Sequence, residues 1–476
     1  MLIGDFFYFE WPQSLMTLTT TSIYFVVFVF LVFCLSRIFN SILRPYVLLL
    51  ANIFFLYTFG LNHLIVVLAM AIFAYLLGIL LERIHKLYLL IIGIAAVVLA
   101  LGFFKYYPSE SMFMPLGISF YSFKIISYLI DIYQDKVIAE YNPIYFLDYV
   151  LFFPCLTAGP IHRYSHFREE IREKKEFNYK EAKGGAFQML LGIFEKMVFC
   201  DFVASVVNRA LDNPAVVGQG ALLGVLLYSF QIYLDFDAIS NIAIGCARLL
   251  GFNLEKNFNS PYLAKTIKEF WNRWHISLST WLRDYIYIPL GGNRKGVWRK
   301  YLNIMIVFLV SGIWHGSTLN FLLWGIIHGL LQIIEDFIGI FFNSFKIDEK
   351  VKKILKYPLS ILGIIVNFFI VSFTWLIFKY QSFTQIQEIL KRINVGGAIN
   401  FELIGLTHNE VIWLVVILAI VVILDILRNY TNMIEAFNNF IFPLRWAIYV
   451  ILIVSFMIFG MYGGSFEASD FIYRWF

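Results

Sequence analysis

Charged residues are scarce in this sequence, and their scarcity excludes most soluble folds. Lys, Arg, Asp and Glu make up 14% of the 476 residues, whereas soluble domains carry roughly 25%. Hydrophobic residues make up 60%. Apolar runs of about 20 residues, the length that a membrane-spanning helix needs, recur along the whole chain. The sequence therefore predicts an integral membrane protein rather than a water-soluble enzyme with an anchor.

Paired cysteines and metal-ligand motifs are also lacking. The four cysteines, Cys34, Cys155, Cys200 and Cys246, lie scattered in apolar runs without disulfide or zinc spacing. They are interpreted as small buried hydrophobic residues. No HExxH, GxSxG or Walker pattern occurs, so we predict no bound metal. The net charge of +5 is modest and is explained by basic residues in cytoplasmic loops, so it does not indicate a nucleic-acid partner.

The apolar runs predict an all-α polytopic fold of about 11–13 transmembrane helices, treated as a single membrane domain over residues 1–476. Pro154 interrupts the apolar segment 143–160, which we expect to be re-entrant or packed against the bundle. The run 220–250 exceeds one span and is expected to tilt or break. The expected spans are 18–36, 45–60, 63–82, 87–104, 116–134, 186–211, 220–250, 302–316, 319–342, 357–379, 411–427 and 444–462.

Basic loops orient the spans, because Lys and Arg concentrate on the cytoplasmic side. The loops 162–183, 252–301 and 346–356 are rich in Lys and Arg and are assigned to the cytoplasm. Both termini, including the tail 463–476, are then expected outside. The N-terminus lacks a basic region and a small-residue cleavage site, so the first span is expected to serve as its own signal.

The segment 252–301 is too long for an ordinary connection and predicts interfacial helices. Plotted as one helix, residues 271–288 place tryptophan, leucine and tyrosine on one stripe and polar residues opposite. Such a helix is expected to lie in the cytoplasmic membrane interface. His275 falls on the shoulder of the apolar stripe, where it can face a protein cavity.

His315, within "SGIWHGS" at 311–317, is the strongest candidate for chemistry. An ionisable residue inside a membrane marks a functional site by default. A neutral imidazole can accept a proton from a hydroxyl that attacks a thioester or ester carbonyl. An equally weighted alternative is that His315 is a structural residue of the core, with its ring nitrogens hydrogen-bonded to a neighbouring helix.

The other histidines are interpreted as core residues or as solvent-exposed loop residues, without a chemical role. His328 is interpreted as a core histidine, and His162 and His166 as solvated loop residues; His63, His85 and His408 receive no role. Asp235 and Asp237 lie within a span, where carboxylates need partners. We favour a structural role for both, anchoring Arg248 or a basic residue of 252–301, over one in orienting a catalytic histidine. At this point a transferase, a transporter and a channel all remain open.

An ordered series of sequence strings resembles the membrane-bound O-acyltransferase family. The resemblance is strongest over 105–330 and is closest to the bacterial branch of alginate and peptidoglycan O-acetyltransferases and teichoic acid D-alanyl-transfer proteins. "YIPLGGNRKG" favours the acetyltransferases, whereas "DFDAISN" at 235–241 departs from the alginate pattern. The strings are "PLGISFYSFKIISYLIDIY" (115–133), "AGPIHRY" (158–164), "EKNFNSPY" (255–262), "IKEFWNRWHISLSTWLRDYIYIPLGGNR" (267–294) and "SGIWHGS".

The resemblance implies a fold and two site residues. The helices would form a ring around a thinned centre, where an extracellular funnel meets a cytoplasmic pocket. His315 would be the catalytic residue at the narrow point, and His275 the second residue on the cytoplasmic side. The final residues, "FIYRWF" at 471–476, match an F-x-Y-x-x-F ending found in such acyl-transfer systems. Tyr473 is therefore a candidate covalent relay, with an aromatic membrane anchor as the alternative.

These implications define the expected function. The enzyme would take an acetyl group from acetyl-CoA in the cytoplasm and pass it across the bacterial inner membrane to hydroxyls of an extracytoplasmic polysaccharide. Besides membrane lipid, it would work with an extracytoplasmic SGNH-type transferase, because no soluble domain of that kind occurs in the chain. Alternatives are D-alanyl transfer from an acyl carrier protein to teichoic acid, acylation of a lipid or protein, and a polymer or lipid transporter or flippase. The lack of an internal repeat weighs against the transporter.

Overall fold

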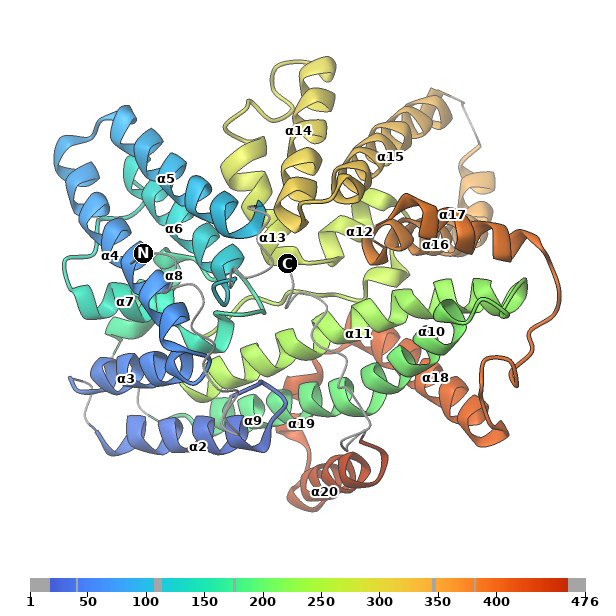
Figure 1. Ribbon diagram of the computed structural model, residues 1–476, viewed down its shortest axis with the longest axis horizontal. Helices are drawn as coiled ribbons and strands as arrows, with labels where there is room; N and C mark the ends of the chain where they lie inside the picture. Colours follow the sequence, from blue (N-terminus) through green and yellow to red (C-terminus); the bar gives the residue numbers. More distant parts are fainter. Residues whose placement is uncertain are drawn as a thin grey trace, which may run out of the picture. The chain divides into compact units, whose positions relative to one another are not determined.

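A computed structural model describes residues 18–39, 42–106, 114–173, 177–344, 348–380 and 382–460. These residues form helices, turns and irregular segments, with no β-strand among them (Figure 1). The α-helices are α2 (Ile23–Ile38), α3 (Arg44–Tyr57), α4 (Leu61–Ile84), α5 (Leu87–Tyr106), α6 (Ile118–Tyr133), α7 (Pro143–Leu151), α8 (Tyr164–Arg172), α9 (Tyr179–Phe194), α10 (Asp201–Asp212), α11 (Gln219–Leu249), α12 (Ile267–Arg273), α13 (Ile276–Leu282), α14 (Val297–His315), α15 (Leu319–Ser344), α16 (Glu349–Lys379), α17 (Phe383–Asn394), α18 (His408–Tyr430), α19 (Met433–Asn439) and α20 (Phe442–Phe459).

Eight helices in the described residues are long and apolar enough to cross a membrane, namely α4, α5, α11, α14, α15, α16, α18 and α20. Three apolar segments, Ile23–Ile38, Arg44–Tyr57 and Pro143–Cys155, are shorter. Many large apolar side chains on these helices are exposed, such as Leu99 and Ile451. Exposed apolar surfaces of this kind cause aggregation in water, but in a membrane they can contact the lipid tails. The predicted all-α polytopic membrane fold is confirmed, while a ring around a thinned centre stays a prediction.

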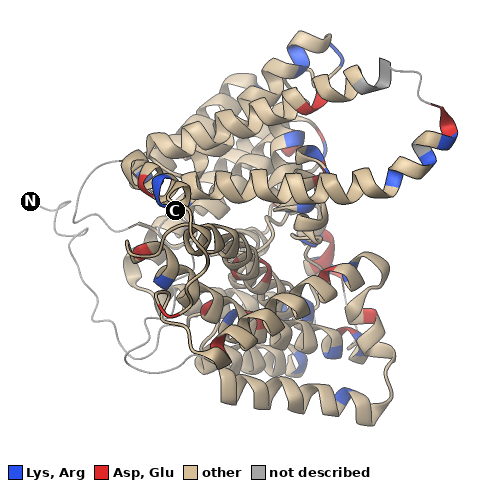
Figure 2. Cartoon of the chain, turned by 90° about the vertical axis from the view of Figure 1, so that its right-hand side faces the viewer, with Lys and Arg blue, Asp and Glu red and all other residues tan. Residues whose placement is uncertain are grey.

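Charged residues are rare along the long helices (Figure 2). A run of basic residues, Lys350, Lys353 and Lys356, marks the start of α16, where the sequence predicted a cytoplasmic loop. Lys and Arg at the end of a span are typical of its cytoplasmic end. The run is therefore compatible with the predicted orientation, which itself stays a prediction.

Two segments that the sequence left ambiguous have defined structures. The run 220–250 forms one unbroken helix, α11, of 31 residues. At 1.5 Å per residue it is about 46 Å long, which exceeds a membrane core of about 30 Å, and of the expected tilt or break, the break does not occur. Segment 143–160 forms the short α7 and a 3₁₀ turn at Phe153–Cys155. Asn52 accepts the Phe153 N–H at 2.9 Å. Protein groups thus cover the interrupted backbone, as a re-entrant segment requires.

The chain divides into two compact units, each described separately. The first contains the described residues up to Ile193 together with Ile239–Glu255. In it, α9 packs closely on the end of α11, because a Cβ at Gly185 or Gly245 would collide with the backbone of the other helix. Arg248 joins the same helices by an ion pair with Glu181 at 2.5 Å.

The second unit contains Phe194–Ala238 and the described residues from Lys256 onwards. Within it, α14 and α15 pack extensively against each other and lie side by side in Figure 1. Two glycines carry the contact: a Cβ at Gly312 would overlap the Phe321 carbonyl, and one at Gly325 would overlap the Phe308 carbonyl. Small residues let helix backbones approach in membranes, where packing replaces the hydrophobic effect as the driving force.

Buried ion pairs hold the second unit together around α11. The Lys196 ammonium lies 2.9 Å from Asp235 and 3.0 Å from Asp201, and all three side chains are buried. The structural interpretation of Asp235 agrees with this pairing. Its partner is nevertheless Lys196, from the π-helical segment Glu195–Cys200, rather than Arg248 or the 252–301 segment.

Asp237 pairs with Arg428 of α18, which also lies 2.7 Å from Glu195. The expected partner, Arg248, was wrong here too, because it is bound to Glu181. A buried carboxylate needs a cation within the same apolar surroundings, and only the fold decides which one reaches it. These pairs join α11, α18 and the π-helical segment.

We expect Gly325→Val to lower the thermal midpoint of the purified protein in lipid by several degrees. The added side chain would meet the Phe308 carbonyl, and overpacking of this kind costs about 1–3 kcal/mol. The matched control is Gly339→Val on the same helix, since a Cβ there meets no atom within 4 Å. Equal midpoints for the two variants would contradict the tight contact of α14 with α15.

Candidate active site

His315 is the last residue of α14, and Gly316 follows it as the helix ends. The imidazole is buried, with 4% of the residue exposed. Three rings surround it at centroid distances of 4.8 Å for Trp314, 5.2 Å for Trp324 and 5.3 Å for Phe378. We call these three residues the aromatic cluster. His315 therefore lies in a protein interior and does not face lipid.

His328, on α15, has partners for both ring nitrogens. Its Nδ1 accepts from the Trp271 Nε1–H at 3.3 Å, and its Nε2 lies 3.0 Å from the Thr374 hydroxyl. The Thr374 hydroxyl donates to the Val371 carbonyl, so Nε2–H must be the donor to Thr374. His328 is thus a neutral, fully bonded core histidine, in agreement with its structural interpretation.

The helix expected over 271–288 is wrong, because the chain breaks at Trp274 and His275. Helix α12 ends at Arg273, α13 begins at Ile276, and Arg283–Tyr287 is π-helical. His275 adopts the left-handed conformation with φ of 44°. The cause is the chain at 257–259: the Ile276 N–H donates to the Asn257 carbonyl, and the Asn259 N–H to the Arg273 carbonyl. Side-chain periodicity cannot reveal this competition for backbone hydrogen bonds.

The same asparagine orients the His275 ring. Asn257 Oδ1 accepts from the Ser277 N–H at 3.2 Å and from the Ser277 hydroxyl at 2.9 Å, which identifies this atom as the amide oxygen. His275 Nδ1 lies 3.2 Å from the same oxygen and must carry a proton to donate. The lone pair of the neutral ring is then on Nε2. Burial lowers the pKa of His275 to about 3, so the ring stays neutral near pH 7.

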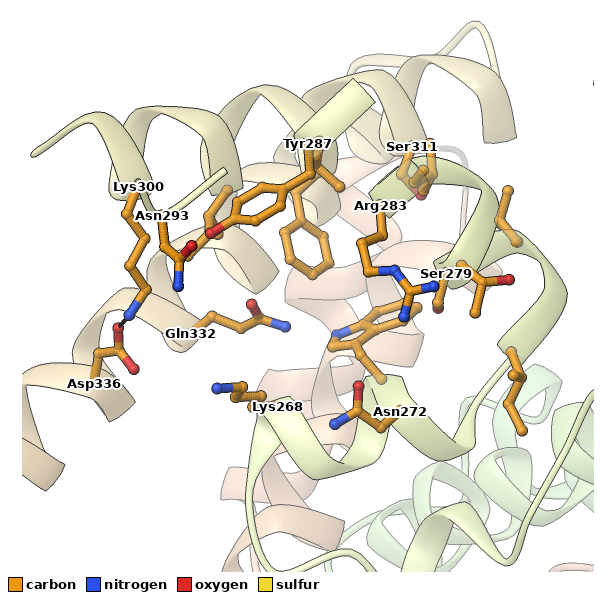
Figure 3. A pocket seen from close by; sticks show the side chains of 18 residues that line it. Lys268, Asn272, Ser279, Arg283, Tyr287, Asn293, Lys300, Ser311, Gln332 and Asp336 are labelled. Carbon is orange, nitrogen blue, oxygen red and sulfur yellow. Dashed lines mark hydrogen bonds and ion pairs between the residues drawn. The ribbon is translucent and has the colours of Figure 1, made fainter. Parts of the chain in front are cut away.

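A pocket of about 530 Å³ opens beside α12 and α13. Its polar side chains include Lys268, Arg283 and Lys300 (Figure 3). Lys300 is paired with Asp336, and Arg283 lies 2.8 Å from Asp284. The remaining lining residues are Asp336, Trp271, Asn272, Ile276, Leu278, Ser279, Thr280, Leu282, Tyr287, Asn293, Ile304, Val307, Phe308, Ser311 and Gln332. The pocket thus combines three cationic groups, one carboxylate and several amides with an apolar wall.

His315 continues the face of α14 that lines this pocket. The lining positions Ile304, Val307 and Ser311 are spaced by three and four residues, and His315 lies four residues beyond Ser311. Trp271, another lining residue, contacts Trp324 at 5.5 Å. The pocket wall is therefore in direct contact with the aromatic cluster around His315.

His275 and His315 lie in the same unit, but neither residue lines the pocket. His275 precedes α13, which contributes Ile276, Ser279 and Thr280 to the wall. Tyr473 lies outside the described residues. The sequence also did not predict Asn257 and Trp324, because an amide and an indole in apolar surroundings look like ordinary core residues.

The interpretation of His162 as a solvated residue is wrong. It is buried, with Nε2 3.7 Å from Glu170, and burial lowers its pKa. The Tyr149 hydroxyl donates to its carbonyl, which fixes the start of α8 against α7. His166, by contrast, is solvated as predicted, with 55% of its side chain exposed. The charged residues that follow His162 in the sequence conceal its burial, because α8 also carries a buried face with Tyr164, Phe167 and Ile171.

Comparison with known proteins decides the family. The sequence model of the membrane-bound O-acyltransferase family matches residues 134–383. The chain belongs to this family. The matched segment contains His275, His315 and all of the pocket, so the predicted resemblance is confirmed.

Three relatives illustrate the range of similarity. A probable alginate O-acetylase of Pseudomonas aeruginosa is 35% identical over 62% of this chain and 58% of its own length. A peptidoglycan O-acetyltransferase of Helicobacter pylori is 30% identical over 76% of this chain and 75% of its own. A teichoic acid D-alanyltransferase of Bacillus subtilis is 29% identical over 58% of this chain and 72% of its own. The chain thus matches less than two thirds of the alginate relative.

The lowered pKa of His275 predicts a loss of stability in acid. Above pH ~6.5 the ring is neutral in both the folded and the unfolded chain and makes no contribution. Between pH ~6.5 and about 3 the unfolded chain binds a proton that the folded one does not, which costs up to about 1.4 kcal/mol per pH unit. We therefore expect the thermal midpoint to fall less steeply from pH 7 to pH 4 in His275→Asn than in wild type.

Asparagine is the suitable replacement because it tolerates the left-handed conformation and can donate to Asn257. The control is His166→Gln, at an exposed histidine, which should keep the wild-type acid slope. An unchanged slope in His275→Asn would contradict the assignment.

Proposed function

We propose that this protein is the membrane-embedded O-acyltransferase that moves an acetyl group from cytoplasmic acetyl-CoA across the membrane, for O-acetylation of an extracytoplasmic polysaccharide. The observation that carries the proposal is the continuity of one helix face from a cation-bearing pocket to a buried histidine, within the family-matched segment. The names of the alginate and peptidoglycan relatives favour acetyl transfer to a cell-envelope polymer.

The pocket suits a thioester donor with an anionic head and a long neutral arm. Lys268 and Arg283 would bind donor phosphates, since guanidinium and ammonium groups form charge-assisted bonds to phosphate oxygens. Asn272 and Gln332 would bind the amides of the arm. The thioester would then lie beyond Ser311, next to His315.

His315 would act as the general base. It removes the proton of the attacking hydroxyl while the hydroxyl oxygen bonds to the thioester carbonyl carbon. When the carbon–sulfur bond breaks, the departing thiolate takes that proton and leaves as the free thiol. The aromatic cluster excludes water, which reduces loss of the acyl group to hydrolysis.

His275 would assist from the cytoplasmic side without carrying charge. Its neutral ring and its bond to Asn257 hold the start of α13, and α13 presents Ser279 and Thr280 to the donor. Its role is thus to keep one wall of the donor pocket in place. His315 would therefore transfer the proton, and His275 would position the wall that binds the acyl donor.

Tyr473 would carry the acyl group onward from His315. Its phenol, on a tail that the predicted topology places outside, would accept the acyl group as an ester and present it to an SGNH-type transferase. An aromatic membrane anchor is the alternative for this residue. We place the protein in the bacterial inner membrane with both termini outside.

D-alanyl transfer from an acyl carrier protein to teichoic acid is the second candidate, favoured by the D-alanyltransferase relative. The same pocket and histidine would serve it, since a carrier protein presents a thioester on a similar arm. A lipid or protein acceptor remains a further variant of the acyltransferase. A transporter or flippase would instead move substrate without consuming a thioester.

His315→Ala should reduce the release of free CoA from acetyl-CoA by about 10²–10⁴-fold, because general-base catalysis contributes about that much. The assay uses the full chain in lipid, with His166→Gln as a control at an exposed histidine. Undiminished release in His315→Ala would contradict its role. Consumption only when a charged carrier protein replaces acetyl-CoA would favour the D-alanyl candidate, and no consumption with either donor would favour the transporter.

Tyr473→Phe should abolish the radiolabel that acetyl-CoA leaves on the chain, since phenylalanine has no hydroxyl to form an ester. The label is measured on the purified chain after denaturation, and polymer acetylation is measured with the partner present. Tyr430→Phe is the control, at a tyrosine that is 82% exposed. Normal acetyl transfer by Tyr473→Phe would rule out the relay and leave the membrane anchor.

A further inference from the structure

The indole N–H of Trp324 is an unused hydrogen-bond donor inside the protein. Trp324 is 1% exposed, and its Nε1 has no hydrogen-bond partner among the described residues. Leaving a buried donor unpaired costs about 1–3 kcal/mol, so such groups in a native structure need an explanation.

Neighbouring tryptophans show that this interior can satisfy indole donors. Trp271 Nε1–H donates to His328 at 3.3 Å, and Trp375 Nε1–H donates to the Tyr262 hydroxyl at 3.1 Å. Both rings contact Trp324, at 5.5 Å and 6.0 Å. The unpaired donor of Trp324 therefore contacts two other indoles whose N–H groups have fixed protein partners.

Trp324 is also held directly against His315. Its ring centroid lies 5.2 Å from that of His315, with the planes at 87°. The next residue, Gly325, brings α15 against the Phe308 carbonyl of α14, so the ring has little freedom to move away. Phe378 contacts both rings, at 5.6 Å and 5.3 Å. A buried N–H donor on a ring held beside the proposed general base is the kind of group that can stabilise an oxyanion.

We propose that Trp324 Nε1–H is the hydrogen-bond donor to the acyl carbonyl oxygen of the thioester at His315. This inference rests on the proposed function. As the hydroxyl oxygen of the acceptor bonds to the carbonyl carbon, its proton passes to His315 and the carbonyl electron pair moves to oxygen. The indole N–H binds that oxyanion without releasing its own proton. The carbonyl re-forms as the carbon–sulfur bond breaks, and the thiolate takes the proton from His315.

The test compares Trp324→Phe with wild type in lipid. Phenylalanine keeps an aromatic ring and removes the N–H. We expect kcat for acetyl-CoA consumption to fall by about 10²–10³-fold, as after removal of one oxyanion donor in other enzymes. Binding of S-ethyl-CoA, a thioether without the carbonyl, should stay unchanged. Binding of acetonyl-CoA, a ketone that keeps the carbonyl, should weaken.

Trp375→Phe is the matched control, because this ring is equally buried and its N–H serves a structural bond to Tyr262. It should lower the thermal midpoint with little effect on kcat. If Trp324→Phe does not fold, 3-benzothienylalanine at position 324 replaces the N–H with sulfur in the same ring outline and should give the same loss of kcat.

Two results would overturn the inference. A folded variant without the N–H that keeps kcat and acetonyl-CoA affinity near the wild-type values would exclude Trp324 alone and leave the proposed function intact. A wild-type protein that neither binds nor consumes acetyl-CoA or a carrier-protein thioester would overturn the proposed function, and this inference with it.

Discussion

The contact between the α14 and α15 backbones is the constraint on which the candidate site depends. Glycines at 312 and 325 allow the two helices to approach until side chains of one would overlap carbonyls of the other. This approach brings Trp324 and His328 of α15 to the same interior as His315. In a membrane such packing is not driven by exclusion of water, so small residues and close contact must supply it.

In the second unit, some buried polar groups have partners within the protein and others have none. Lys196 and Arg428 each neutralise more than one carboxylate, and both nitrogens of His328 are bonded. These groups are structural, because burying them without partners would cost more than the fold gains. The indole N–H of Trp324 is one of several buried polar groups in the described part of this unit that have no hydrogen-bond partner, and it lies next to the histidine that the proposed chemistry uses. Its position beside His315, rather than its lack of a partner alone, is what links this donor to the proposed chemistry.

The histidines show how far sequence pattern alone can separate structural from chemical roles. His315 was identified as buried in a span, and the structure places it in an aromatic interior. His162 was assigned to solvent because charged residues surround it in sequence, yet it is buried. His275 was placed on a continuous helix, which the chain at Asn257 interrupts. In each error the deciding neighbour is distant in sequence or hidden by the local composition.

The sequence by itself determined the class of the molecule: scarce charge and repeated apolar runs of membrane-spanning length leave helices as the way to satisfy the backbone in lipid. Its ordered motifs also identified the family and the histidine on which the proposal rests. The tertiary structure alone decided which cation meets Asp235 and Asp237, which tautomer His275 adopts, and that the pocket face of α14 leads to His315. These are contacts between segments separated along the chain, and periodicity carries no information about which segments meet.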